Sequence, residues 1–298
     1  MNEVAYEPHE GFVAPARPSA AIWRLIVGFV AAGAIYVALN QLYFNAIYAL
    51  LGPESDAFHG DLLSGTTAPA MYVLLSSFVF MIVGVGVVAR VLHWRSLASL
   101  LGPSTLFIPQ FWAVLRVLLV LGLVIFLLPP WDMAQEFEQN LPLNRWLMLL
   151  PLSLLAVLVQ VSAEEIVFRG YVQQQLAARF RSPLVWMVLP AAIFAVGHYL
   201  PEQAGDNALL IALWAGLFGI LMADLTARSG SLGPAIAVHF ANNVSAILIA
   251  SMPDDLSGLA LYLVPFSMQD VEVMREWLVV DFALMLVSWL AARLAIRR

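Results

Sequence analysis

Two adjacent carboxylates stand at the end of a long apolar stretch and are the first candidates for chemistry in this chain. The stretch begins at Trp146 and contains no charged residue before Glu164 and Glu165. A charged side chain at bilayer depth costs about 2.5–3.5 kcal/mol on insertion scales and usually faces a bundle interior or a wet cavity. Arg169 follows Glu165 by four residues, so these two can pair on one face of a helix. Glu164 is rotated by about 100° from Glu165. It can therefore act elsewhere, unless the three residues are only a charge cluster at a helix end.

Two further pairs of residues with helical spacing lie in later apolar stretches. Phe194 precedes His198 by four residues, and His239 precedes Asn243 by four residues. Each pair therefore shares one helical face. Taken singly, a histidine or an asparagine inside a membrane usually makes a hydrogen bond between helices. The hypothesis of a shared site depends on bringing these residues together.

Residue counting brings the first carboxylate and the first histidine to one depth. Glu164 and His198 each lie 17 residues from the turn at Arg181 (181 − 164 and 198 − 181). In an antiparallel hairpin of regular helices, we expect these two side chains to face one another. A carboxylate facing an imidazole can activate a water molecule, and His239 with Asn243 can supply donors to a developing oxyanion. The pattern predicts a hydrolytic site.

Several other chemistries are excluded or less favoured. The chain has no cysteine, which excludes thiol nucleophiles and iron–sulfur clusters. It contains neither a Gly-x-Ser-x-Gly nor a His-Glu-x-x-His motif, and nothing resembles a nucleic-acid-binding patch. A zinc site made of Glu164, His198 and His239 with a water in the fourth position is the alternative. We favour a site without a cofactor, because Asn243 is a poor zinc ligand and a good hydrogen-bond donor.

The composition predicts the elements that must position these residues. Of 298 residues, 62% are hydrophobic and 11% are charged, whereas soluble domains carry about 25% charged residues. Apolar runs lie at about 23–50, 69–92, 112–129, 146–178, 183–200, 207–227, 232–251 and 276–296. The sequence therefore predicts an all-α polytopic membrane protein with about eight transmembrane helices. Residues 1–20 are expected to be a disordered cytoplasmic tail. Residues 21–298 are expected to be a single transmembrane domain with the candidate motifs in 146–251.

The charges assign a side of the membrane to each connection. The arginines near one set of helix ends are Arg17, Arg24, Arg90, Arg95, Arg116, Arg179, Arg181, Arg228, Arg293, Arg297 and Arg298. The alternate connections are acidic and hold only Arg145 and Arg275 as basic residues. Because connections rich in arginine stay in the cytoplasm, both termini are predicted to be cytoplasmic. The expected location is the inner (plasma) membrane of a bacterium.

The three motifs together resemble a known family. They are Glu164-Glu165-x-x-x-Arg169, Phe194-x-x-x-His198 and His239-x-x-x-Asn243, in this order on successive apolar helices. In this the chain is similar to the CPBP family of intramembrane endopeptidases, which includes CAAX prenyl endopeptidases, bacteriocin-processing or immunity proteins and proteins like lysostaphin resistance protein A. No motif position departs from the family pattern.

The resemblance implies an intramembrane endopeptidase that acts on membrane-associated peptides or proteins, either CAAX-like or leader-bearing. It implies that Glu164 is the general base and that His198 assists the water. It also implies that His239 and Asn243 stabilise the tetrahedral intermediate. Glu165, Arg169 and Phe194 would then support the site. The family has been described both as metal-dependent and as glutamate-dependent, so the resemblance leaves zinc open.

Two other classes of function remain open. The same fold could serve as a non-proteolytic membrane scaffold or immunity protein. It could also be a proton-coupled transporter, in which Glu164, Glu165 and Asp224 would relay protons together with the histidines. The absence of a visible inverted repeat in the sequence counts against transport. The oligomeric state does not follow from the sequence.

Overall fold

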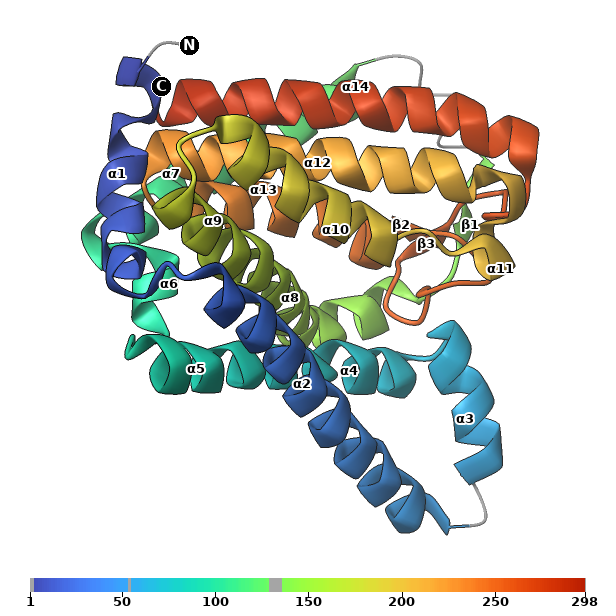
Figure 1. The fold of residues 1–298 in the computed structure, drawn as a ribbon. Coiled ribbons are helices and arrows are strands. Elements are labelled where there is room, and N and C mark those ends of the chain that lie inside the picture. The colour runs from blue at the N-terminus through green and yellow to red at the C-terminus, as the bar shows by residue number, and fades with distance from the viewer. Residues whose placement is uncertain (1–2, 53–54, 129–135, 298) are drawn as a thin grey trace.

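The structure is a computed structural model that describes residues 3–52, 55–128 and 136–297. Helices make up most of the described chain, and the strands in these ranges are three of two residues each. Figure 1 shows α8 and α9 between a layer that contains α12 and α14 and a layer that contains α4 and α5. The second half of α8, which carries the motif, has most of the buried positions of this helix: Val157, Gln160, Val161, Ala163 and Glu165.

Six helical stretches are long and apolar enough to cross a membrane. They are α2 (Ile22–Leu51); α4 (Ala68–Ser77) with α5 (Val79–His93); α7 (Ser104–Leu127); α8 (Leu143–Glu165), continued through a π-helical segment (Ile166–Gln173) into α9 (Gln174–Arg179); α11 (Pro201–Ala204) with α12 (Ala208–Ser229); and α14 (Val271–Ala295). Two shorter apolar stretches are Leu184–Gly197, which ends in α10 (Leu189–Gly197), and Gly233–Ile249, which begins with α13 (Gly233–Asn243). Each stretch corresponds to one of the eight predicted runs, so the predicted all-α polytopic membrane protein is confirmed.

The boundaries differ from the prediction in a few places. Helix α7 begins at Ser104 rather than near 112, and Pro109 inside it removes one backbone hydrogen bond of the second turn. Residue 129, the last of that predicted run, lies outside the described residues. Short elements that the sequence reading did not place are α3 (Ser55–Ser64) and α6 (Ala98–Leu101).

The N-terminal segment is ordered, which corrects the expected disordered tail. It forms a 3₁₀ turn (Glu3–Tyr6), α1 (Glu7–Val13) and a second 3₁₀ segment (Ala14–Ser19), and residues 1–2 lie outside the described chain. Phe12 is only 2% exposed, and Tyr6 donates a hydrogen bond to Asp224 at 2.7 Å. Burial against Trp186 lowers the pKa of His9 to about 4, so this side chain is neutral at physiological pH. A few apolar residues suffice here because α9 and α12 offer a surface that covers them.

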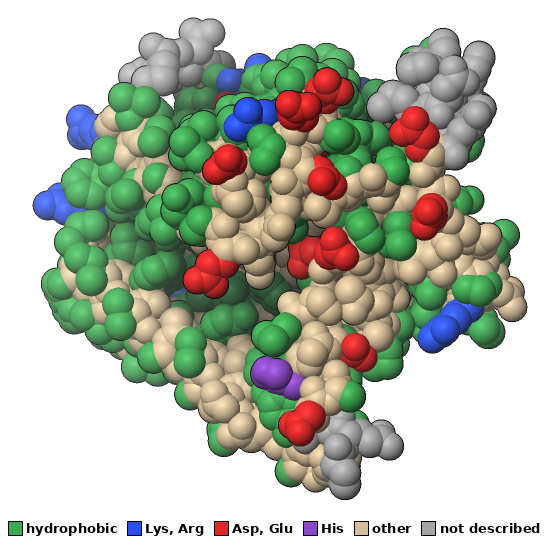
Figure 2. All heavy atoms as spheres, turned by 90° about the vertical axis from the view of Figure 1, so that its right-hand side faces the viewer, with side chains coloured by type: hydrophobic (Ala, Val, Ile, Leu, Met, Phe, Trp, Pro, Cys, Tyr) green, Lys and Arg blue, Asp and Glu red, His purple; other side chains and the backbone are tan. Residues whose placement is uncertain are grey.

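The two ends of the bundle carry different charges. The chain termini and α6 lie at one end, whereas α3, α11 and the small sheet lie at the other (Figure 1). Figure 2 shows acidic side chains gathered over that second end. Exposed acidic residues from two separate connections are Glu202 and Asp206 in the first and Asp254 and Asp270 in the second. The acidic connections therefore share one end of the molecule, as the charge pattern predicts.

The small sheet joins the segments that follow and precede the motif helices. Strand β3 (Tyr262–Leu263) pairs antiparallel with β1 (Glu138–Gln139) and parallel with β2 (Ala250–Ser251). Close to this sheet, the Trp146 indole donates a hydrogen bond to the Leu248 carbonyl at 2.8 Å. The start of α8 is thereby tied to the end of the stretch that begins with α13.

Close packing at a glycine fixes the other end of α13. A Cβ atom at Gly233 would lie 2.4 Å from the Phe107 carbonyl oxygen of α7. Only glycine allows this approach of the two backbones. Helix α13 is therefore held at both ends, and its polar residues face α8.

Candidate active site

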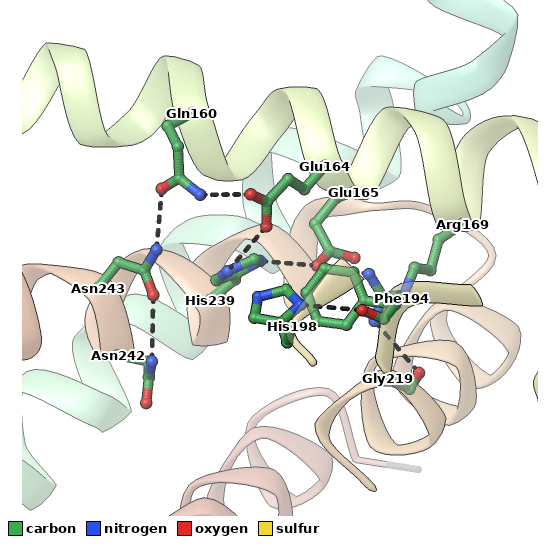
Figure 3. Close-up of polar contacts among 10 residues, drawn as sticks. All are labelled: Gln160, Glu164, Glu165, Arg169, Phe194, His198, Gly219, His239, Asn242 and Asn243. Atoms are coloured by element: carbon green, nitrogen blue, oxygen red, sulfur yellow. Dashed lines mark hydrogen bonds and ion pairs between the residues drawn. The ribbon is translucent and has the colours of Figure 1, made fainter. Parts of the chain in front are cut away.

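A buried ion pair forms the base of the site. Glu165 and Arg169 are 0% and 1% exposed, and Arg169 Nη1 donates to Glu165 Oε1 at 3.1 Å (Figure 3). The second guanidinium nitrogen donates to the Gly219 carbonyl at 3.3 Å, and the Phe194 ring lies 5.0 Å from the guanidinium carbon. The predicted pairing of Glu165 with Arg169 is confirmed. Phe194 covers the pair, which keeps water away from it.

His239 lies between the two adjacent carboxylates. Its Nδ1 donates to Glu165 Oε1 at 2.8 Å, and its Nε2 lies 3.5 Å from Glu164 Oε2. The Phe218 ring packs edge-on against the imidazole, with centroids 4.9 Å apart. Because the bond to Glu165 fixes the ring, the position of Nε2 beside Glu164 is also fixed. His239 of α13 thus contacts both carboxylates of α8.

Gln160 connects Glu164 with Asn243 through two hydrogen bonds. The sequence analysis did not identify this residue. Its Nε2 donates to Glu164 Oε1 at 2.7 Å, and its Oε1 accepts from Asn243 Nδ2 at 2.8 Å. Gln160 is 7% exposed. It precedes Glu164 by four residues in an otherwise apolar run, so the same i,i+4 rule could have identified it.

Asn242 adds one more amide to this cluster. Some of the site residues also keep part of their surface exposed. Asn242 Nδ2 donates to Asn243 Oδ1 at 3.1 Å. Glu164 retains 13% of its side-chain exposure, and Asn243 and His198 are half-buried. The ion pair beneath them is sealed. The two carboxylates therefore differ. Glu165 is fully buried and paired with Arg169, whereas Glu164 keeps part of its surface exposed.

His198 does not pair with Glu164, which corrects the residue-counting prediction. Its Nδ1 donates to the Phe194 carbonyl at 2.9 Å, and its ring lies 4.3 Å from the Phe194 ring. Within the described residues, no hydrogen bond or ion pair joins His198 to Glu164. The count assumed regular α-helices, but both arms of the hairpin contain π-helical segments, Ile166–Gln173 and Leu184–Val188. A π-helical turn holds more residues than an α-helical turn, so equal counts no longer mean equal depth and rotation.

The described residues do not bring the three ligands of the zinc alternative together. In the ranges that the structure describes, no group of three or more histidine, cysteine or acidic side chains is placed to hold a metal ion. Glu164, His198 and His239 would have to converge with a free nitrogen on each ring. Both rings donate through Nδ1 and so keep Nε2 free, but the side chains do not converge: His239 lies beside Glu164, whereas His198 packs against Phe194.

Asp224, the further acid that a proton relay would use, is already engaged. Arg228 Nε lies 2.9 and 2.8 Å from its two carboxylate oxygens. The Trp289 indole and the Tyr6 hydroxyl also donate to it. This acid joins the N-terminal segment, α12 and α14, and its contacts are structural.

Comparison with known proteins agrees with the motifs. Residues 145–245 match the family model described as type II CAAX prenyl endopeptidase Rce1-like, and this range includes every residue of the site above. The chain is also 24% identical over 259 residues to the uncharacterized protein YyaK of Bacillus subtilis (strain 168), covering 83% of this chain and 84% of that protein. No solved structure matches the chain. Through residues 145–245, this multi-pass membrane protein is similar to the Rce1-like type II CAAX prenyl endopeptidases.

Proposed function

We propose that this protein is an intramembrane endopeptidase that hydrolyses peptide bonds of membrane-associated substrates with a water molecule activated by Glu164. The observation that carries the proposal is the different surroundings of the two adjacent carboxylates. Glu165 is fully buried and held by Arg169 and His239, whereas Glu164 remains partly exposed beside the same histidine. Two neighbouring carboxylates in unlike environments are a frequent basis for divided roles in catalysis.

The chemistry follows from the positions of the side chains. Glu164 takes a proton from water as the water oxygen bonds to the peptide carbonyl carbon, and it then gives the proton to the leaving amine as the C–N bond breaks. His198 donates through Nδ1 to Phe194, so its Nε2 is left as an acceptor that can orient the water. Among the described residues, this nitrogen makes no hydrogen bond.

The oxyanion would be stabilised by donors on α13. The contact between His239 Nε2 and Glu164 is 3.5 Å long, which is too long for a strong hydrogen bond. With Nδ1 donating to Glu165, Nε2 can donate to a substrate oxygen only when the imidazole is protonated, and the long contact with Glu164 leaves that proton available. Asn243 has two amide hydrogens, and Gln160 accepts only one of them. His239 lies beside Glu164, and Asn243 is joined to Glu164 through Gln160, so we expect both groups to reach the carbonyl that the water attacks.

A metal-free mechanism predicts a large effect of Asn243. Removing one oxyanion donor typically costs about 10²–10³ in kcat, so Asn243→Ala should lose at least about a hundredfold in turnover. Extensive chelation should leave the wild-type protein active. Turnover of a membrane peptide by the purified protein measures both effects. The matched control is Asn45→Ala, because Asn45 is an exposed asparagine on α2. Loss of activity with a chelator that stoichiometric zinc restores would defeat the metal-free mechanism.

We also place the protein in the bacterial inner (plasma) membrane with both termini in the cytoplasm. The support is the alternation of arginine-bearing and acidic connections along the sequence, together with the acidic side chains gathered over one end of the bundle. Reporter fusions at residues 95, 181 and 229 should read cytoplasmic, and fusions at 56, 136, 204 and 256 should read on the opposite side. A signal from the opposite side at residue 181 would reverse the orientation.

The substrate class follows the family. Its name supports a CAAX-like peptide, and leader-bearing membrane peptides are the second class to test. A panel of both, incubated with purified protein, tests whether either is cleaved. If neither is cleaved by a well-folded sample, the scaffold or immunity role becomes the better reading. The transporter role lacks support, because Asp224 is bound by Arg228.

A further inference from the structure

The amides of the site form a chain that can run in only one direction. An ionised carboxylate accepts hydrogen bonds and cannot donate them. Glu164 must therefore face the NH₂ group of Gln160, at 2.7 Å. The amide oxygen of Gln160 then faces Asn243, which must present its own NH₂ group, at 2.8 Å. The Asn243 oxygen is left to accept from Asn242 at 3.1 Å.

This order decides which side of Asn243 faces the site. Oxygen and nitrogen of an amide are assigned from the surrounding network. Here the network ends on the carboxylate of Glu164, which can only accept. If Gln160 were absent, only the longer hydrogen bond from Asn242, at 3.1 Å, would oppose a turn of the Asn243 oxygen toward the site. An inward oxygen would repel the developing oxyanion rather than stabilise it. The orientation of the Asn243 amide thus depends on Glu164, because a carboxylate at this position can only accept a hydrogen bond from Gln160.

We propose that Gln160 is a positioning residue that orients both Glu164 and Asn243 for catalysis. The inference rests on the proposed function, since it assigns the two groups that Gln160 holds as base and oxyanion donor. Gln160 itself is 7% exposed and acts through its two neighbours. Its length also matters: it connects Glu164 on its own helix with Asn243 on α13, and asparagine is one methylene shorter.

The first test removes the amide. Gln160→Leu should lower kcat by about ten- to a hundredfold with KM changed less than threefold, because binding surfaces remain while two reacting groups lose their orientation. Gln41→Leu is the matched control, since Gln41 is an exposed glutamine within α2. It should retain activity within about twofold. A wild-type kcat in Gln160→Leu would overturn the proposal.

A double-mutant cycle separates positioning from general damage. Part of the effect of Gln160→Leu passes through Asn243. In the Asn243→Ala background, Gln160→Leu should therefore cost less than it does alone. Independent losses that multiply would contradict the link to Asn243. If Glu164→Gln keeps full activity, the proposed function fails; if it is inactive while Gln160→Leu has normal kcat, only the role of Gln160 fails.

A second variant keeps the test decisive if Gln160→Leu does not fold. Gln160→Glu can accept from Asn243, but it can donate to Glu164 only when the new carboxyl carries a proton. Its activity should therefore approach the wild-type value on the acidic side and fall at higher pH, where two carboxylates repel one another. The wild-type profile should not fall over the same range. Identical pH profiles for the two proteins would overturn the proposal.

Discussion

Glu164→Gln is expected to abolish proteolysis while leaving the protein folded and inserted in the membrane. Glutamine keeps the volume of the side chain, and its oxygen can still accept the hydrogen bond that Gln160 donates at 2.7 Å. It cannot take a proton from water, and general base catalysis contributes typically about 10²–10⁴ in rate. The measurement is cleavage of membrane peptides by the purified variant beside the wild type.

The control for this variant removes a carboxylate outside the site. Glu202 is exposed in α11, so Glu202→Gln should cleave at the wild-type rate. Monodisperse elution in detergent and an unchanged unfolding midpoint would show that Glu164→Gln is folded. Full activity of Glu164→Gln would remove Glu164 as the base. It would favour Glu165 or a purely structural charge cluster.

Glu165→Gln should destabilise the whole protein rather than affect only the reaction. The side chains of Glu165 and Arg169 are 0% and 1% exposed, so the variant leaves a buried guanidinium without its carboxylate. Breaking a buried pair by removing one partner costs about 3–5 kcal/mol. The bond from His239 Nδ1 loses its charged acceptor at the same time. The free energy of unfolding in detergent or bicelles measures the loss.

Two comparisons identify the cause of that loss. The double variant Glu165→Gln/Arg169→Met should recover part of the stability, because no unpaired charge remains in the interior. Glu10→Gln breaks an ion pair with Arg17 whose side chains are 71% and 53% exposed, and surface pairs contribute little. It should leave the unfolding free energy nearly unchanged. Equal effects of Glu165→Gln and Glu10→Gln would contradict a structural role for the buried pair.

Contacts within one helix could be predicted from the sequence, because helical spacing is a local property. The pairs Glu165–Arg169 and Asp224–Arg228 follow from the i,i+4 rule and are present in the structure. The contact of Phe194 with His198 obeys the same rule. The apolar runs were equally informative. Polar backbone groups in lipid need hydrogen-bond partners, and a helix supplies all of them within one segment.

Contacts between helices required the tertiary structure. Residue counting paired Glu164 with His198, but His239 is the imidazole beside Glu164. The π-helical segments that change the count begin immediately after Glu165 and after Pro183, and no apolar pattern distinguishes them from α-helix. Depth and rotation of a side chain both depend on these segments. A local change from α-helix to π-helix therefore changed which histidine lies beside Glu164.

The N-terminal segment and Gln160 show the same division between sequence and structure. Residues 3–19 are polar enough to read as a tail, yet Phe12 and Val13 are buried because other helices supply a complementary surface. Gln160 was visible as a polar residue in an apolar run, but its partner Asn243 lies 83 residues away. The sequence by itself determined which segments are helices and which residues share a face. Only the packing of those faces decided which side chains meet, because that depends on the rotation and depth of every helix at once.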